Sequence, residues 1–295
     1  MRARVLPTDL VDLHTHSMAN DGRWTAASLA AEAIARGLRV VALTDHDTVA
    51  GVQGFARAAQ LVGLVSLPAV EMSSWWHGTI YHVLLYAIDP THPALSALLD
   101  GVRGQATGAA ARARDRLRAR GHSLADLERI AGGQEPLPYH VLLAALRSGL
   151  GMTFAEVVRY VVEDLGIRFA AAADMAEVVQ VGHRAGGLAV LAHPGRAEFG
   201  FAVAAPRDVA DMAAMTGLDG LEVYHWSHGP AEESLYGRLA QELGLLVSSG
   251  SDSHGPNSSR PLRGREAARC RALLERCGIG VADATGAALV EGSEE

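Results

Sequence analysis

His14 and His16 stand two residues apart at the end of a short apolar run, and a carboxylate, Asp21, follows them. Side chains two positions apart on a β-strand point to the same face, so both imidazoles can reach one metal ion. Mixed imidazole and carboxylate ligands suit Zn, Mn or Fe(II), and the absence of cysteine from this motif argues against a purely structural zinc site. The spacing therefore predicts a site for metal-assisted chemistry.

Four further clusters of histidine and carboxylate follow apolar runs in the same way. They are Asp45-His46-Asp47 after Val40–Leu43, Glu71 after Val65–Val70 with His82 opening the next run, His193 after Leu188–Ala192, and Asp252 with His254 after Leu245–Ser249. A single histidine at a strand end is more often an ordinary hydrogen-bonded residue, but five such clusters would meet on one rim. The candidates outnumber the ligands of one ion, so we expect two or three divalent ions (Mn, Zn or Fe).

The apolar runs are the strands that must position these clusters. Helical patterns lie between many of them, such as Ala26–Arg36 before Gly37 and Val52–Val62 before Gly63. Alternating buried strands and helices predict a parallel sheet or a barrel of the α/β class. In both architectures the active site lies at the carboxyl ends of the strands.

The middle of the chain has a different pattern, almost wholly helical from about Pro93 to Val181. The alternation of strand and helix patterns resumes at Leu188, so we interpret the helical part as an insertion between two halves of one domain. The predicted boundaries are 8–95 and 182–290 for a discontinuous barrel, and 96–181 for a helical insertion that acts as a substrate cap.

Composition limits the partners. The chain has 295 residues and a formal net charge of -7, which gives no overall field to hold long nucleic acid. A small phosphorylated substrate is compatible with this charge, because a metal cluster supplies local positive charge. No signal peptide and no apolar window of about 18 residues is present, so we expect a cytoplasmic protein with no membrane partner. Its two cysteines, Cys270 and Cys277, are expected to be semi-buried thiols.

The motifs resemble those of the PHP (polymerase and histidinol phosphatase) family. They occur in chain order as Asp12 to His16 with Asp21-Gly22, Leu43 to Gly51, Glu71-Met72-Ser73, His82, Ala192 to Arg196, Leu221 to Tyr224 and Gly250 to Gly255. The resemblance covers about Leu10 to Leu99 and Gly186 to Gly255. It implies a distorted (β/α)7 TIM-like barrel with a helical insertion. The metal ligands it implies are His14, His16, Asp21, His46, Glu71, His82, His193, Asp252 and His254.

Within that family the chain most resembles stand-alone bacterial members that remove phosphate from small nucleotides. The resemblance implies a phosphoric monoester hydrolase acting on the 3'-phosphate of nucleoside 3',5'-bisphosphates or on an AMP-like substrate; relatives trim the 5' ends of short RNA. Such members carry Arg-Pro-His in the insertion, where this chain has Pro138-Tyr139-His140. A later lysine is also absent, and the nearest basic residue is Arg168. His140 and Arg168 are therefore the expected substrate-binding residues of the insertion.

We hypothesise that a hydroxide bridging two ions attacks phosphorus while Arg196 steadies a non-bridging oxygen through its N–H donors. His228 or His225 would protonate the leaving group, with His228 slightly favoured; the alternative, in which both only line the rim, is equally open. Trp75 would stack on a base, although packing is the commoner role for such a tryptophan.

Three further aspartates have structural alternatives. Asp45 and Asp47 would orient histidine ligands through hydrogen bonds, or else serve as turn and helix-capping residues. Asp12 would point away from the histidine pair or lie behind it.

The same residues are compatible with three other functions. The same ligand set can activate water against C–N bonds, although Arg196 favours phosphoesters. Histidinol-phosphate hydrolysis is the other activity for which the family is named, and the long insertion is less expected for it. An alternative from a different class is a metal-bound but inactive scaffold module. The presence of all nine ligands argues against it.

Overall fold

The fold is described from a computed structural model, which covers residues 3–133, 135–196 and 202–283. Its described residues form two compact units: one runs up to Ser96 and resumes at Asp174, and the other is Ala97–Ala173. The predicted insertion, 96–181, is longer than the second unit because α7 (Met175–Arg184) packs against strands of the first unit. Residues 284–290 of the predicted barrel lie outside the described residues.

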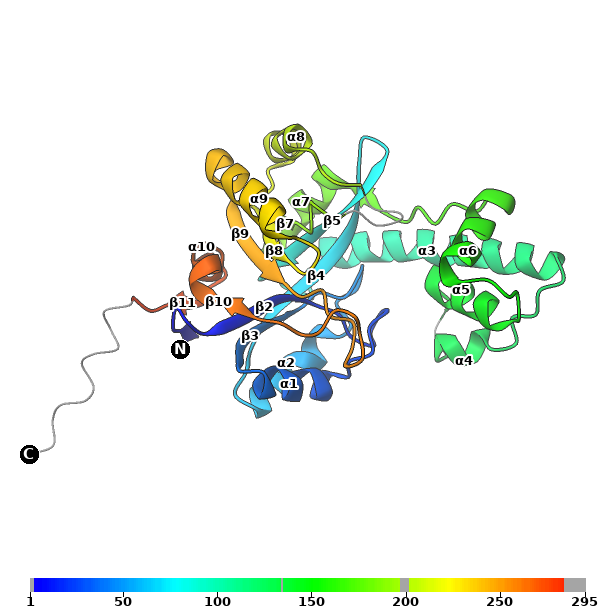
Figure 1. Cartoon of the computed structure of the whole chain (residues 1–295), viewed down its shortest axis with the longest axis horizontal. Helices are drawn as coiled ribbons and strands as arrows, with labels where there is room; N and C mark the ends of the chain where they lie inside the picture. Colours follow the sequence, from blue (N-terminus) through cyan, green and yellow to red (C-terminus); the bar gives the residue numbers. More distant parts are fainter. Residues whose placement is uncertain (1–2, 134, 197–201, 284–295) are drawn as a thin grey trace, which may run out of the picture. The chain divides into compact units, whose positions relative to one another are not determined.

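One large sheet forms the centre of the first unit (Figure 1). Eight of its strands lie side by side in the order β10 (Arg265–Glu266), β2 (Leu10–Thr15), β3 (Leu38–Leu43), β4 (Val65–Trp76), β5 (Thr79–Tyr86), β7 (Leu188–Leu191), β8 (Gly220–His225) and β9 (Leu246–Gly250). The chain after β9 returns to β2, where the N–H of His16 donates to Ser253 O (3.0 Å) and the N–H of Asp252 donates to His14 O (2.9 Å). The sheet is therefore nearly closed, like a barrel.

The strand directions are mixed, and this differs from an ideal (β/α)7 barrel. β5 runs antiparallel to both β4 and β7, whereas β2, β3 and β4 are parallel, as are β7, β8 and β9. The cause is a two-residue hairpin between β4 and β5, in which His77 (φ 47°) and Gly78 (φ 83°) both have positive φ. Such a turn matches the twist of two antiparallel strands. The expectation of a mixed α/β, barrel-like fold is confirmed at this coarser level.

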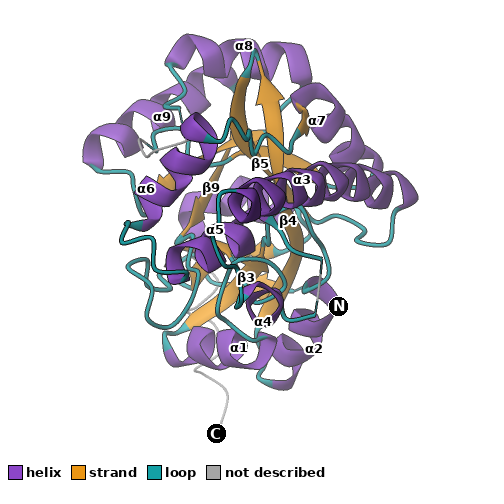
Figure 2. Cartoon of the chain, turned by 90° about the vertical axis from the view of Figure 1, so that its right-hand side faces the viewer, coloured by secondary structure: helices purple, strands orange, loops and turns teal. Residues whose placement is uncertain are grey.

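Helices cover the outside of this sheet (Figure 2). They are α1 (Ala26–Ala35), α2 (Val52–Leu61), α7, α8 (Pro206–Thr216), α9 (Pro230–Leu243) and α10 (Arg271–Arg276), the last preceded by a 3-10 turn, Ala267–Cys270. α1 begins at a reciprocal cap, in which Thr25 Oγ1 accepts from Ser28 N (3.0 Å) and Ser28 Oγ accepts from Thr25 N (2.9 Å). The helices predicted from Ala26 and Val52 are confirmed.

The apolar core fixes the strands that carry the polar clusters. On β2, Val11 and Leu13 are fully buried and belong to one core cluster with residues of β3, β4, β5 and β7. Tyr86, also fully buried, donates from its hydroxyl to Leu13 O (2.9 Å) and lies 2.9 Å from Ser248 Oγ. It therefore joins β5 to β2 and β9 through the interior.

The second unit is helical and has its own core. It contains most of α3 (Pro93–Ala119), then α4 (Leu127–Ala131), α5 (Pro138–Arg147) and α6 (Phe154–Arg159), which a π turn at Tyr160–Asp164 extends. Buried side chains such as Leu117, Val141 and Val161 pack together there. The remaining strands are β1 (Arg4–Val5) paired with β11 (Gly280–Val281), and β6 (Ala173–Asp174). Among the described residues, no helix has the length and apolarity needed to cross a membrane.

A candidate metal centre at the strand ends

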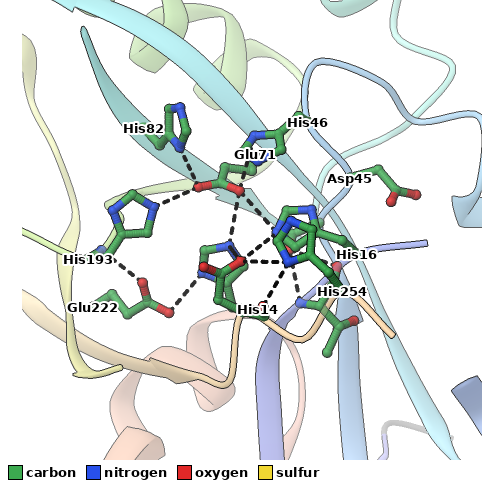
Figure 3. Close-up of polar contacts among 12 residues, drawn as sticks. His14, His16, Asp45, His46, Glu71, His82, His193, Glu222 and His254 are labelled. Carbon is green, nitrogen blue, oxygen red and sulfur yellow. Dashed lines mark hydrogen bonds and ion pairs between the residues drawn. The ribbon is translucent and has the colours of Figure 1, made fainter. Parts of the chain in front are cut away.

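Glu71, near the middle of β4, is the hub of a histidine cluster (Figure 3). Its carboxylate is fully buried, and five histidine nitrogens surround it. Oε1 lies 2.8 Å from His82 Nδ1 and 3.0 Å from His193 Nε2, and Oε2 lies 3.0 Å from His14 Nε2, 3.2 Å from His16 Nε2 and 3.2 Å from His46 Nδ1. One carboxylate thus contacts histidines on β2 and β5 and in the segments that follow β2, β3 and β7.

Asp252, just after β9, is a second hub. Its Oδ1 lies 3.1 Å from His16 Nε2 and 3.4 Å from His254 Nδ1. Asp21 closes the same side, with Oδ2 3.2 Å from His254 Nε2. Because Asp252 and Glu71 both approach His16, the two hubs form one continuous cluster.

The structure brings all nine predicted metal ligands into this cluster. Their ligand atoms lie within 4.8 Å of one another in four overlapping groups: His16, Asp21, His46 and His254; His14, His16 and Asp252; His14, Glu71 and His193; and His46, Glu71 and His82. A fifth such group joins His14 to two residues that were not predicted as ligands, Glu222 and His225. Separate but overlapping groups are the arrangement that two or more ions with shared ligands require.

Buried polar atoms without hydrogen-bond partners show that a cation fits here. Both ring nitrogens of His16 and one oxygen of Asp21 are buried and lack a hydrogen bond of acceptable geometry. Such atoms carry a desolvation penalty unless something binds them. The lone pairs of imidazole and carboxylate are ligands for Zn, Mn and Fe, so a divalent ion would satisfy them.

Burial and opposite charges shift the ionisation of the cluster. Burial opposes ionisation of Glu71 and Asp252, yet the facing histidines hold the pKa of both carboxyls well below their usual values. Burial would likewise lower the pKa of His16, but its contacts with Asp252 and Glu71 raise it to about 10. Burial lowers the pKa of His46 to about 3 and that of His193 to about 4. The carboxylates are therefore ionised near neutral pH, and His46 and His193 are neutral, as metal ligands must be, whereas His16 would have to release a proton when an ion binds.

Glu222 on β8 contacts two members of the cluster, His14 and His193, and we did not predict this role. Its Oε1 lies 3.0 Å from His14 Nδ1, and its Oε2 accepts from the backbone N–H of His193 (2.8 Å). Gly250 leaves space for it, since a Cβ there would lie 2.7 Å from Glu222 Oε1 and 2.0 Å from the Cβ of His14. The signal in the sequence was a carboxylate inside the apolar run Leu218–Tyr224, because a buried charge needs a partner.

Replacing Glu222 with glutamine is expected to weaken metal binding about 10- to 100-fold, because the partner that orients a metal-bound imidazole tunes its affinity. The glutamine keeps the volume but loses the charge that faces His14 Nδ1. Competition with a chelating dye measures the affinity. Glu32→Gln, at a partly exposed pair with Arg36, is the matched control and should bind metal like wild type. Equal affinities for all three proteins would contradict the role of Glu222.

The neighbouring aspartates, Asp45 and Asp47, make hydrogen bonds that hold loops together. Asp45 accepts from Ser17 Oγ (2.7 Å), and Figure 3 shows its carboxylate pointing away from the cluster. Asp47 accepts from the Ser73 hydroxyl and backbone N–H (2.8 Å each). Of the two predicted alternatives, these hydrogen bonds to serines favour the structural role in turns over the orientation of histidine rings.

Asp12 is a fully buried residue of β2. It accepts from the N–H groups of Ser251 (2.9 Å) and Arg263 (3.3 Å), and so fixes the chain after β9 against β2.

The two candidate proton donors differ in their surroundings. His228 is engaged at both ring nitrogens: Nδ1 lies 2.9 Å from Val223 O, and Nε2 accepts from the N–H of Gly195 (3.0 Å). This arrangement places its proton on Nδ1 and leaves none to give at Nε2. His225 instead has a buried Nε2 without a hydrogen-bond partner, 3.5 Å from Asp252 Oδ2. The geometry favours His225 over His228, which reverses the slight preference drawn from the sequence.

The predicted substrate-binding residues are spread over both units. Arg196 is 7% exposed and lines a pocket of about 370 Å³ together with Asp21, His46, His254, Ser258, Ser259 and Arg260. Trp75 is half-buried on β4, four residues beyond Glu71, or about 13 Å along an extended strand. His140 and Arg168 belong to the second unit, where His140 Nδ1 accepts from the N–H of Leu137 (3.1 Å) at the start of α5.

Comparisons with known proteins agree with this cluster. The PHP domain family matches residues 12–95. A 5'-3' exoribonuclease of Haemophilus influenzae is 30% identical (84% of this chain, 91% of the relative), and a 3',5'-nucleoside bisphosphate phosphatase of Chromobacterium violaceum is 32% identical (83% and 87%). A phosphoribosyl 1,2-cyclic phosphate 1,2-diphosphodiesterase of Eggerthella lenta is 30% identical (83% and 94%).

Two solved structures have a similar fold. A protein described as a metal-dependent phosphoesterase of Bifidobacterium adolescentis superposes with a TM-score of 0.78 at 26% identity, covering 94% of this chain and 98% of its own. A protein of Chromobacterium violaceum described as an amidohydrolase, with bound sulfate and no metal, gives a TM-score of 0.72 at 31% identity, covering 86% and 90%.

Proposed function

Because this chain belongs to the PHP family of metal-dependent phosphoesterases, we propose that it removes a phosphate from a small nucleotide, with nucleoside 3',5'-bisphosphates as the preferred substrates. The observation that carries this proposal is that Arg196, whose guanidinium has the N–H donors that phosphate oxygens accept from, lines one pocket with three members of the cluster, Asp21, His46 and His254. A guanidinium beside a metal centre suits a phosphoester better than a C–N bond, since its N–H fork matches phosphate oxygens.

The nine cluster residues would hold two or three ions, and bound ions would supply an activated water and neutralise charge on the phosphoryl oxygens. Arg196 would orient the phosphate through a non-bridging oxygen. His225, in its protonated form, would give a proton to the leaving oxygen, and His228 would keep the Gly195 backbone in place through Nε2. Glu222 would hold the ring of His14 in the orientation that the cluster needs.

The substrate class rests on the relatives. One is named for nucleoside bisphosphates, another for a cyclic phosphate and a third for RNA, and all three names describe chemistry at phosphorus in a nucleotide or a ribose phosphate. Trimming of short RNA from its 5' end is the second candidate, which the identity with the Haemophilus influenzae relative favours. We propose His140, Arg168 and Trp75 as substrate-binding residues, and the helical unit as the substrate cap.

Chelation should abolish turnover. Treating the purified protein with EDTA is expected to lower kcat/KM by at least about 1,000-fold, because several kcal/mol of transition-state stabilisation depend on the ions. Adding Mn²⁺ should restore the rate. The assay uses adenosine 3',5'-bisphosphate, AMP, a short 5'-phosphorylated RNA and histidinol phosphate, with phosphate or mononucleotide release as the readout. The proposal fails if histidinol phosphate is the best substrate, or if no substrate is turned over by protein that contains metal.

A further inference from the structure

Arg260 lies beside the candidate metal centre, in a loop outside the sequence motifs of the metal ligands. The loop follows β9, and Ser258, Ser259 and Arg260 line the same pocket of about 370 Å³ as Arg196. Arg260 also lines a neighbouring pocket of about 220 Å³, which includes Trp226 and Arg263. It is therefore part of the wall between two adjacent cavities.

Two strong contacts fix the guanidinium of Arg260. Its Nη1 lies 2.6 Å from Asp252 Oδ2, and its Cζ lies 4.5 Å from the centroid of the Trp226 ring. Trp226 is held in turn, because its Nε1 donates to the same Asp252 oxygen (3.2 Å). An arginine stacked on an aromatic face and paired with a carboxylate has lost most of its side-chain freedom, so binding a ligand costs it little further entropy.

Arg196 approaches the same oxygen, with Nη1 at 3.3 Å from Asp252 Oδ2. The two oxygens of Asp252 have different neighbours: Oδ1 faces His16 and His254, and Oδ2 faces the two arginines together with Trp226 Nε1 and, at 3.5 Å, His225 Nε2. Two guanidinium groups against one carboxylate charge leave this wall of the pocket cationic. Guanidinium groups hold phosphate oxygens through paired N–H donors.

We propose that Arg260 binds the phosphoryl group of the substrate together with Arg196. Both guanidinium groups would donate hydrogen bonds to it from the side of the pocket where they contact Asp252. This inference rests on the proposed phosphoester hydrolysis and extends it to a residue outside the motifs quoted above. Asp252 then has two roles, one oxygen directed to the metal centre and the other to the arginine pair.

Binding of inorganic phosphate to the Mn²⁺-loaded protein, measured by calorimetry, tests this role. Arg260→Ala is expected to raise the phosphate Kd about 10- to 100-fold, the loss that follows removal of a charged hydrogen-bond donor. Arg260→Lys, which keeps the charge without the fork, should show a smaller loss. The control is Arg263→Ala, because Arg263 lines only the smaller of the two pockets and should leave the phosphate Kd unchanged. In nucleotide assays the Arg260 variants should show a raised KM.

The metal content of the same samples shows whether Arg260 binds phosphate itself or only positions Asp252. Our proposal expects Arg260→Ala to keep its metal while it loses phosphate. Loss of metal in step with loss of phosphate would show that Arg260 only positions Asp252, and would overturn the proposal, as would an unchanged phosphate Kd in both Arg260 variants. Wild-type protein that binds phosphate through Arg260 but hydrolyses no nucleotide would reject the proposed function and still support the Arg260 site.

Discussion

Replacing Glu71 with glutamine is expected to remove most of the bound metal and to lower kcat/KM by at least about 1,000-fold. Glu71 faces five histidine nitrogens within 3.2 Å, more than any other carboxylate in the described structure. Glutamine has the same shape, but it offers one neutral oxygen and an amide that repels a cation. Metal analysis after gel filtration, together with the nucleotide assay, measures both losses.

The ranking of two variants makes this test sharp. Glu71 contacts the rings at the centre of the cluster, whereas Glu222 acts through the outer nitrogen of His14 and the backbone of His193. Glu71→Gln should therefore lose more metal than Glu222→Gln. Glu71 sits in a regular strand opposite Leu84, so the substitution should leave the circular dichroism spectrum unchanged. Full metal content in Glu71→Gln would show that the hub does not bind the ions.

Much of this site could be predicted because it follows from strand geometry. Parallel strands end at one rim, so polar residues placed after apolar runs, such as His46 after Val40–Leu43, must meet there. The alternation of side chains along β2 places His14 with Asp12 and not with Leu13, and the buried apolar neighbours confirm which runs are strands. The family resemblance then supplied the ligand set, and the structure brings its members together.

Other features depend on contacts that spacing does not contain. The hairpin at His77 and Gly78 turns β5 antiparallel, although the apolar pattern of a strand is the same in either direction. Asp45 and Asp47 flank the candidate ligand His46 in sequence, yet their side chains form hydrogen bonds with Ser17 and Ser73. Arg260 comes from a loop with no periodic pattern at all. Each of these required knowledge of which segments touch.

Backbone strain marks the same rim. Among the described residues, five other than glycine have positive φ, and three of them, Asp47, His193 and Asp252, follow strands at the candidate metal centre. Non-glycine residues in this region cost free energy unless the surrounding structure compensates. The sequence offers only a weak indication of this, since aspartate and histidine tolerate the left-handed region better than most residues.

Replacing Asp252 with asparagine is expected to abolish turnover, with a loss of at least about 1,000-fold in kcat/KM, while leaving the fold intact. The fold should survive because Asp252 has a φ of 51°, and asparagine adopts the left-handed region as readily as aspartate. The activity should not survive, because one charge serves both His16 through Oδ1 and the arginine pair through Oδ2. An amide cannot accept hydrogen bonds on both sides.

The control is Asp211→Asn, at an exposed position on α8 where the carboxylate lies 3.9 Å from Arg207 Nε. It should retain wild-type activity and metal. Thermal unfolding of the metal-free proteins checks that all three share one fold. The asparagine variant has no negative charge next to His16, so both its metal content and its phosphate affinity should fall. Arg260→Ala should lose phosphate affinity alone. Substantial turnover by Asp252→Asn would show that Asp252 is not part of the metal centre and does not link the ions to the arginine pair.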